Sequence, residues 1–281
     1  MISIEHKYQG SDKLGLVGYS WRPETNPIAV VCIIHGMGEH SGRYEHVANY
    51  FVERNIAVFA IDQRGHGKSE GNRGDAPNYA FLVNQIDLML GEATSSYPGV
   101  PTVVYGHSMG GNLAINHALR DELEGPEGYI VTSPWLELAL KPPAVQLTVG
   151  KMIKSILPSL VQKSNLDTKD LSRDEQIVKA YENDPLVHNK ISIRFFFNIV
   201  EAGKWALENA SKLDRRMLLM HGGSDKITSF KASDKFSGRA GKFVTFKKWS
   251  GFYHEIHNEP EKKEVLDEMM NWINAVILKI K

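Results

Sequence analysis

The stretch Gly106-His107-Ser108-Met109-Gly110 has the pattern G-x-S-x-G and is the most informative part of this sequence. An apolar run at residues 101–105 precedes it, and a stretch with helical periodicity at residues 112–123 follows it. This order predicts a sharp strand-to-helix turn that strains the backbone at Ser108 and holds its hydroxyl clear of the sheet. The helix after the turn directs unpaired N–H groups at that oxygen, which favours negative charge there. Ser108 is therefore the candidate nucleophile, although an ordinary turn with an incidental serine would carry the same five residues.

Strands and helices are predicted to alternate on both sides of this turn. The short segments rich in β-branched residues, typical of strands, are residues 28–34, 57–61, 102–105, 129–132, 217–220 and 243–246. The segments with apolar residues three and four apart, typical of helices that cover a sheet, are residues 44–54, 79–95, 111–123, 229–237 and 261–280. This alternation predicts an α/β fold with a largely parallel sheet, and residues 2–8 and 14–21 predict an antiparallel hairpin at one edge.

The alternation stops after Ser133-Pro134 and resumes near Asp214. We therefore expect a core made of residues 1–133 and 214–281, with residues 134–213 forming an inserted, mainly helical cap. Apolar residues recur at helical spacing in the cap at Val145, Val149, Met152, Ile153, Ile156 and Leu160. This helix either packs on the main domain, or its apolar face overhangs the active site, meets lipid and forms an acyl channel.

Composition limits the classes of function. Lys plus Arg and Asp plus Glu both number 33 among 281 residues, so no net field attracts nucleic acid or an anionic membrane surface, and a neutral or small substrate fits better. The single cysteine, Cys32, excludes an intramolecular disulfide framework and favours a reducing cytoplasm. No signal peptide or spanning helix is expected, which predicts a cytoplasmic protein that is soluble or peripheral to a membrane.

A serine nucleophile needs a base, and the base needs an acid that orients it. In a strand–turn–helix architecture both should follow the serine on loops after sheet strands, first the acid and then the histidine. Asp225 ends the turn His221-Gly222-Gly223-Ser224-Asp225 after the strand at residues 217–220, although an Asp in a polar turn is also common. His254 lies after the last predicted strand and before the final helix. Among eleven histidines His257 is the main rival, and loop position favours His254.

Two N–H donors are expected to hold the oxyanion. One is the backbone N–H of Met109, directly after the candidate nucleophile, and the other is that of Met37 in the loop His35-Gly36-Met37-Gly38. The sequence has no zinc, calcium, P-loop or dinucleotide-binding pattern, so neither a metal nor a cofactor is expected. The spacing of the histidines around this loop favours positional roles over a metal site.

With these residues in view, the chain resembles the monoacylglycerol lipases of the α/β-hydrolase superfamily, a group also called lysophospholipase-like or serine-aminopeptidase-like hydrolases. The motifs that carry the resemblance are HGMGEHSGRY at residues 35–44, DQRGHGKSEG at 62–71, GHSMGG at 106–111, NDPL at 183–186, the 221–225 turn and YHEIHNE at 253–259. They span nearly the whole chain. The resemblance implies an α/β-hydrolase fold with an inserted cap, and Ser108, Asp225 and His254 as the catalytic triad.

The resemblance also implies that Glu39, Arg43 and His257 line a small polar pocket for a glycerol head group. The cap would then supply a hydrophobic tunnel for the acyl chain, in which each buried CH₂ group contributes about 0.8 kcal/mol. From the residues alone, Glu39 and Arg43 also fit a local salt bridge that braces the oxyanion loop. The chain departs from the family in its cap and at Met37, which is bulkier than the small residue often present there.

The expected activity is hydrolysis of monoacylglycerols to fatty acid and glycerol through an acyl-enzyme on Ser108. A lysophospholipase or a broad carboxylesterase would use the same machinery and stays an alternative. A catalytically silent lipid-binding module and an aminopeptidase are the alternatives from other classes. The expected partner is a small lipid, with transient membrane contact through the cap.

Overall fold

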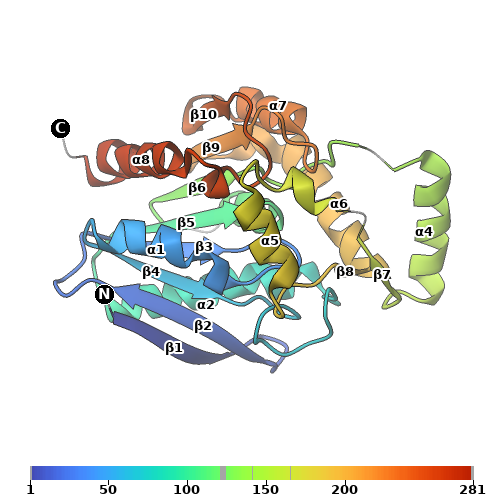
Figure 1. The fold of residues 1–281 in the computed structure, drawn as a ribbon, viewed down its shortest axis with the longest axis horizontal. Coiled ribbons are helices and arrows are strands. Elements are labelled where there is room, and N and C mark those ends of the chain that lie inside the picture. Colours follow the sequence, from blue (N-terminus) through green and yellow to red (C-terminus); the bar gives the residue numbers. More distant parts are fainter. Residues whose placement is uncertain (1, 121–124, 141, 165, 280–281) are drawn as a thin grey trace.

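A single eight-stranded sheet runs through the computed structural model, which describes residues 2–120, 125–140, 142–164 and 166–279 (Figure 1). Its strands lie in the order β1-β2-β4-β3-β5-β6-β9-β10. Their bounds are β1 (Ile2–Gln9), β2 (Gly15–Arg22), β3 (Ala29–Ile34), β4 (Ile56–Ile61), β5 (Thr102–His107), β6 (Gly128–Thr132), β9 (Arg216–Gly222) and β10 (Val244–Trp249). Neighbouring strands from β4 to β10 are parallel, while the β1–β2 hairpin and the β2–β4 pair are antiparallel. The predicted α/β fold with an antiparallel hairpin at one edge is confirmed.

Side chains alternate between the two faces of the sheet, so each central strand contributes to two cores. In β3, Val30 and Cys32 face one core while Val31 and Ile33 face the other. The first core is covered by α2 (Tyr79–Ser96), α3 (Met109–Ala118), α6 (Ile193–Asn209) and α7 (Phe230–Ala240). The second is covered by α1 (Glu45–Val52) and α8 (Lys262–Trp272). Buried parallel strands explain the nearly continuous apolar runs in the sequence.

Some element bounds differ from the expected ones. The last strand extends to Trp249, because Trp249 still pairs with Gly222 of β9, and this shortens the loop before His254. The helix expected at 111–123 begins at Met109 and ends at Ala118, and residues 121–123 lie outside the described part of the chain. The final helix continues from α8 into a π-helical turn, Ile273–Leu278, and residue 280 also lies outside the described part.

The segment between β6 and β9 contains α4 (Ala144–Ile156), β7 (Val161–Lys163), α5 (Glu175–Asn183), β8 (Lys190–Ser192) and α6. Strands β7 and β8 form a small antiparallel pair of their own. Helix α6 lies within the proposed cap boundaries of 134–213, yet it packs against α3, where the Asn112 side chain donates to the Ile199 carbonyl at 3.3 Å. A side chain at Gly203 of α6 would come within 2.3 Å of the Leu136 carbonyl, so this packing is close. The part of the segment that stands apart from the core is therefore shorter than the sequence suggests.

Helix α4 lies at one end of the molecule, away from the sheet (Figure 1). It ends at Ile156, so Leu160 of the expected apolar stripe lies beyond it. The stripe is not packed on the main domain: Val145 is 73% exposed, Met152 65% and Ile156 78%. Across the described ranges, we find no helix with both the length and the apolar character needed to cross a bilayer.

Candidate active site

The turn between β5 and α3 has the strained geometry that the G-x-S-x-G pattern predicts. Ser108 has φ of +54°, a left-handed value that is unfavourable for a residue with a side chain. A side chain at Gly106 would come within 2.4 Å of the Gly110 carbonyl, and one at Gly110 within 2.1 Å of the Ile34 carbonyl. Glycine is therefore required on both sides of Ser108, and the turn holds this residue at the start of α3.

Three polar side chains from separate loops meet at this turn. The Oγ of Ser108 lies 2.9 Å from Nε2 of His254, and Nδ1 of His254 lies 2.8 Å from Oδ2 of Asp225. Asp225 follows β9 and His254 follows β10, so the carboxyl ends of neighbouring parallel strands deliver both side chains. His254 is 3% exposed and Ser108 7%. The distances allow Ser108 to donate to Nε2 while Nδ1 donates to Asp225, which is the tautomer that a general base requires.

The carboxylate of Asp225 favours the protonated form of His254. Burial by itself lowers the pKa of His254, but the carboxylate of Asp225 outweighs it, and the net pKa lies above the ordinary value. Burial by itself raises the pKa of Asp225, but His254 and His221 hold it far below the ordinary range. Asp225 therefore stays ionised while His254 gains and loses a proton.

Local hydrogen bonds hold the Asp225 carboxylate in place. Its Oδ1 accepts from the backbone N–H groups of Ile227 at 2.7 Å and Thr228 at 3.0 Å. Its Oδ2 accepts from the Thr228 hydroxyl at 2.8 Å and lies 3.1 Å from Nε2 of His221. The contacts of Thr228 and His221 with Asp225 were not anticipated from the sequence. The signal available was the aspartate in a turn, because Asp side chains commonly accept from backbone N–H groups two and three residues later in an Asx turn.

The two candidate oxyanion donors lie on either side of Ser108. Met109 is the first residue of α3, where backbone N–H groups lack acceptors within the helix. Met37 follows Gly36 in the loop after β3, and a side chain at Gly36 would come within 3.3 Å of the Ser108 Cβ. The loop therefore runs directly past Ser108, as the second donor of an oxyanion hole would require.

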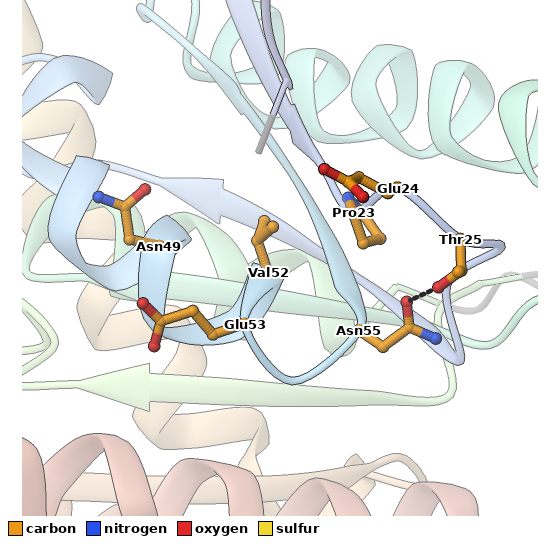
Figure 2. Close-up of a pocket in the computed structure, with 7 residues that line it drawn as sticks. All are labelled: Pro23, Glu24, Thr25, Asn49, Val52, Glu53 and Asn55. Atoms are coloured by element: carbon orange, nitrogen blue, oxygen red, sulfur yellow. Dashed lines mark hydrogen bonds between the residues drawn. The ribbon is translucent and has the colours of Figure 1, made fainter.

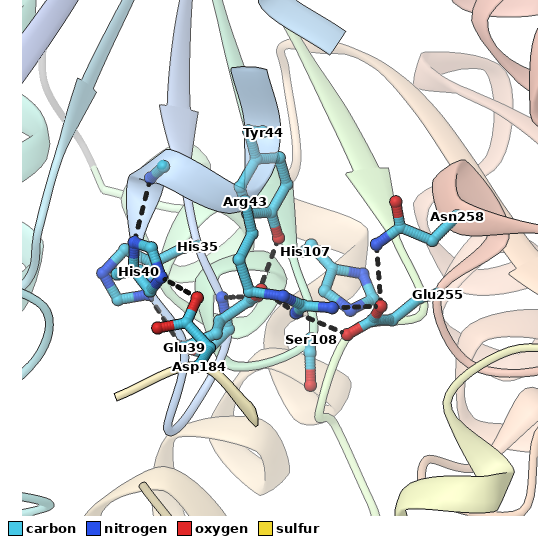
Figure 3. Close-up of polar contacts among 12 residues, drawn as sticks. His35, Glu39, His40, Arg43, Tyr44, His107, Ser108, Asp184, Glu255 and Asn258 are labelled. Atoms are coloured by element: carbon cyan, nitrogen blue, oxygen red, sulfur yellow. Dashed lines mark hydrogen bonds and ion pairs between the residues drawn. The ribbon is translucent and has the colours of Figure 1, made fainter. Parts of the chain in front are cut away.

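A buried ion-pair network braces this loop (Figure 3). Glu39 accepts from the Gly36 N–H at 2.6 Å and from the Tyr44 hydroxyl at 2.8 Å, and it pairs with Arg43. Arg43 also forms a bidentate pair with Glu255 at 2.7 and 2.8 Å. The salt bridge inferred from the residues alone is thus present. Glu255, directly after His254, was not anticipated, since nothing local in the sequence links it to Arg43.

Comparisons with known proteins show the family to which the chain belongs. A family model described as serine aminopeptidase, S33 matches residues 25–261. The monoacylglycerol lipase of Mycolicibacterium smegmatis is 33% identical over 271 residues, which are 96% of this chain and 96% of that protein. The chain belongs to this family of α/β-hydrolases, which includes monoacylglycerol lipases.

Two further matches support the family. The crystal structure of a monoacylglycerol lipase from Paleococcus ferrophilus has a TM-score of 0.81 at 30% identity and covers 97% of this chain and 98% of that one. An uncharacterised abhydrolase domain-containing protein of Dictyostelium discoideum is 40% identical over 269 residues, which are 95% of this chain and 28% of that protein. The α/β-hydrolase fold and membership of an ester-hydrolase family, both predicted from the motifs, are therefore confirmed.

The described residues of this α/β-hydrolase separate the two rival histidines. The structure brings His254, and not His257, to Ser108. His257 is fully buried and lies between the rings of Tyr44 at 5.0 Å and His107 at 4.7 Å. Neither of its ring nitrogens has a hydrogen-bond partner among the described residues, and burial lowers its pKa well below the ordinary value. A glycerol hydroxyl would reach this ring only if the stack opened.

The segment between α4 and α6 forms hydrogen bonds with the loop after β3 that carries Met37. His40 lies 2.9 Å from Asp184, and the Gly38 carbonyl accepts from the His188 N–H at 2.8 Å. The Tyr181 ring stacks on Arg43 at 4.7 Å. The Asn183-Asp184-Pro185-Leu186 motif, whose purpose is not apparent from the sequence, thus places Asp184 against His40.

A second part of the same segment contacts the loop that carries the candidate base. The Leu171 carbonyl accepts from the Glu255 N–H at 2.8 Å, and Asp170 pairs with Lys226 at 3.0 Å. Both loops that flank Ser108 are therefore held by residues 170–188, whereas α4 contacts the rest of the molecule mainly through α6, where Lys154 pairs with Glu201 at 3.2 Å.

A surface hollow elsewhere on the hydrolase is distinct from this site (Figure 2). Its lining residues are Pro23, Glu24, Thr25, Asn49, Val52, Glu53 and Asn55. It lies where β2 ends and β4 begins, at the amino ends of the parallel strands, whereas Ser108 follows the carboxyl end of β5. Within the described ranges no three His, Cys, Asp or Glu side chains gather in a group suited to a metal ion.

Proposed function

We propose that this protein is a serine esterase that hydrolyses monoacylglycerols to free fatty acid and glycerol. The observation that carries the proposal is the hydrogen-bonded series from Ser108 through His254 to Asp225 at a strained strand-to-helix turn. Family membership and the relatives named monoacylglycerol lipase support the substrate class.

The chemistry proceeds in two halves. Ser108 Oγ attacks the ester carbonyl while Nε2 of His254 takes its proton, and the Met37 and Met109 N–H groups bind the oxyanion. The tetrahedral intermediate collapses, His254 passes the proton to the glycerol oxygen, and an acyl-serine remains. Water then attacks the acyl-serine with His254 as base, and the fatty acid leaves with Ser108 restored. No step uses a cofactor or metal.

Charge in the site favours a neutral head group. Arg43 is already paired with Glu39 and Glu255, so its guanidinium is not free for a phosphate. The same pairing argues against aminopeptidase action, because Glu39 and Glu255 are occupied and neither is free to bind a substrate amine. We place the glycerol head group near Glu39, Arg43 and His257, with the acyl chain toward the apolar residues of the cap. Contact with the buried His257 ring requires the ring stack around it to open.

A substrate series tests this proposal. We expect kcat/KM to rise about fourfold for each added CH₂ of the acyl chain until the apolar part of the site is filled, since each group contributes about 0.8 kcal/mol. We expect 1-monoacylglycerols to exceed lysophosphatidylcholine of equal chain length by about tenfold or more, because a phosphate would be buried without a partner. The measurement is the release of fatty acid at substrate concentrations below micelle formation. A faster reaction with lysophosphatidylcholine would make the protein a lysophospholipase, and equal rates for short esters of any alcohol would make it a broad carboxylesterase.

The exposed face of α4 supports a second part of the proposal, contact with an anionic lipid surface. Val145, Met152 and Ile156 expose apolar side chains on this helix. Lys151, Lys154 and Lys163 lie in or just after it, and residues 138–166 include no Asp or Glu. A helix with an apolar face and basic flanks suits the boundary between head groups and acyl chains.

We expect the triple variant Val145→Glu, Met152→Glu, Ile156→Glu to bind vesicles containing anionic phospholipid about tenfold more weakly than the wild type, because three charged side chains replace apolar ones at the interface. Co-sedimentation with vesicles measures the effect. Gln146→Glu, a charge change at an exposed polar position on the same helix, is the matched control. Hydrolysis of a water-soluble short-chain ester should be unchanged in both variants. Vesicle binding by the triple variant at the wild-type level would show that α4 does not mediate the membrane contact.

A further inference from the structure

The carboxylate of Asp225 contacts two buried imidazoles rather than one. Its Oδ2 lies 2.8 Å from Nδ1 of His254 and 3.1 Å from Nε2 of His221. The side chains of His221 and Asp225 are completely buried. His221 lies near the end of β9, four residues before Asp225, so the same strand and turn place both groups.

The hydrogen bonds around His221 define which nitrogen carries the proton. An ionised carboxylate only accepts hydrogen bonds, so the proton of His221 is expected on Nε2, which lies 3.1 Å from Oδ2 of Asp225 and 3.5 Å from the Thr228 hydroxyl. Its Nδ1 lies 2.8 Å from the hydroxyl of Ser233 on α7, which donates to the unprotonated nitrogen of a neutral ring. The ring of Phe230 meets the same imidazole edge-on at 5.8 Å. His221 thus has a polar neighbour at each ring nitrogen, as His254 does.

We propose that His221, held by Ser233, is a positioning residue for the catalytic carboxylate and limits how strongly Asp225 attracts the proton of His254. This inference rests on the proposed function, because it assigns Asp225 as the acid of the triad. Two imidazoles share Oδ2 with the Thr228 hydroxyl, so negative charge that His221 draws toward itself is unavailable to His254. His221 also keeps Oδ2 in line with Nδ1 of His254 as His254 gains and loses its proton.

The ionisable groups around this pair come from several elements. His107 of β5 lies 4.8 Å from the His254 ring, and Glu255 and Glu39 act on His254 through their charges. Lys248 of β10 is the strand neighbour of His221, and its ammonium lies over the Phe230 ring at 5.0 Å. None of these groups changes in the variants described next, so a shift in the titration of His254 reports on His221.

The test compares His221→Leu, which removes the donor, with His221→Gln, whose side-chain amide can still donate to Asp225. His221→Leu should lower kcat for ester hydrolysis about tenfold with little change in KM, because one hydrogen bond to a charged group is lost. The acid limb of the pH profile of kcat/KM should move to higher pH. With one donor fewer, the Asp225 carboxylate stabilises the protonated form of His254 more strongly and so raises its pKa. His221→Gln should restore most of kcat and the wild-type limb. Ser233→Ala should shift the limb in the same direction by a smaller amount.

His117 supplies the matched control, because it is a second buried histidine, 2.8 Å from Asp87, away from Ser108 on α3. His117→Leu should lower thermal stability without moving the acid limb. If His221 had a purely structural role, His221→Leu would also lower thermal stability without moving the acid limb of the pH profile. The inference is overturned if that limb stays at the wild-type pH and kcat of His221→Leu is within about twofold of kcat of His117→Leu.

A readout that needs no substrate separates this inference from the proposed function. The downfield proton resonance of His254 Nδ1–H can be titrated by NMR in the free protein, and its pKa should be higher in His221→Leu than in the wild type. If the wild type hydrolyses no ester but this shift occurs, the proposed function fails and the positioning role stands. If esters are hydrolysed and neither the limb nor the resonance responds to His221→Leu, the positioning role fails alone.

Discussion

Replacement of Ser108 by alanine should lower kcat for monoacylglycerol hydrolysis by about 10⁵-fold, since the acyl-enzyme cannot form without the nucleophile. The residual rate would come from water held near His254 and the oxyanion donors. KM should change little, because a hydrogen atom replaces the hydroxyl at a site that Gly106 and Gly110 shape independently of the side chain. Fatty-acid release and covalent labelling by a fluorophosphonate measure the effect, and both should disappear together.

Ser133 offers a matched control for this variant. It also has a positive φ, of +44°, lies directly after β6, and its buried hydroxyl has no hydrogen-bond partner within the described residues. Ser133→Ala should therefore keep both labelling and turnover. If a folded Ser108→Ala protein still hydrolysed esters, the nucleophile would have to be another residue. A wild-type protein that binds monoacylglycerol but takes up no fluorophosphonate would favour the catalytically silent lipid-binding module.

The sheet and the turn at Ser108 were predictable from sequence because the signals that specify them are local. Buried parallel strands produce apolar runs, and the close approach of backbone atoms at Gly106 and Gly110 admits no other residue. The order of candidate acid and base along the chain follows from the parallel strand arrangement, which delivers Asp225 and His254 from the ends of adjacent strands.

The contacts of the cap and the ion-pair network beside Ser108 could not be predicted in the same way, because both depend on pairs distant in sequence. His40 and Asp184 are 144 residues apart, and Arg43 and Glu255 are 212 apart. Nothing in the local pattern of either partner identifies the other. Helix α6 was also hard to place from the sequence, because it covers the eight-stranded sheet while the strand directly before it, β8, belongs to the separate β7–β8 pair.

The environment of Asp225 makes its replacement by asparagine the most informative test of the acid. Oδ1 accepts two backbone N–H groups, and Oδ2 accepts the Thr228 hydroxyl and His254 while Nε2 of His221 points at it. An asparagine NH₂ would therefore face donors in either orientation, unless His254 changes tautomer so that its Nδ1 accepts from the amide.

Asp225→Asn should consequently lower kcat about 10⁴-fold, because His254 is driven to the tautomer that carries its proton on Nε2 and cannot accept one from Ser108. The loss should persist across the pH range in which the wild type is active, since Asp225 is ionised throughout that range. Asp87→Asn, which alters a separate Asp–His pair in which Asp87 lies 2.8 Å from the buried His117, is the control and should affect stability rather than turnover. If Asp225→Asn kept activity within about tenfold of the wild type, a different carboxylate would have to orient His254. Glu255 is the nearest candidate in sequence, but its bidentate pairing with Arg43 leaves it committed to the guanidinium, so the geometry favours a large loss.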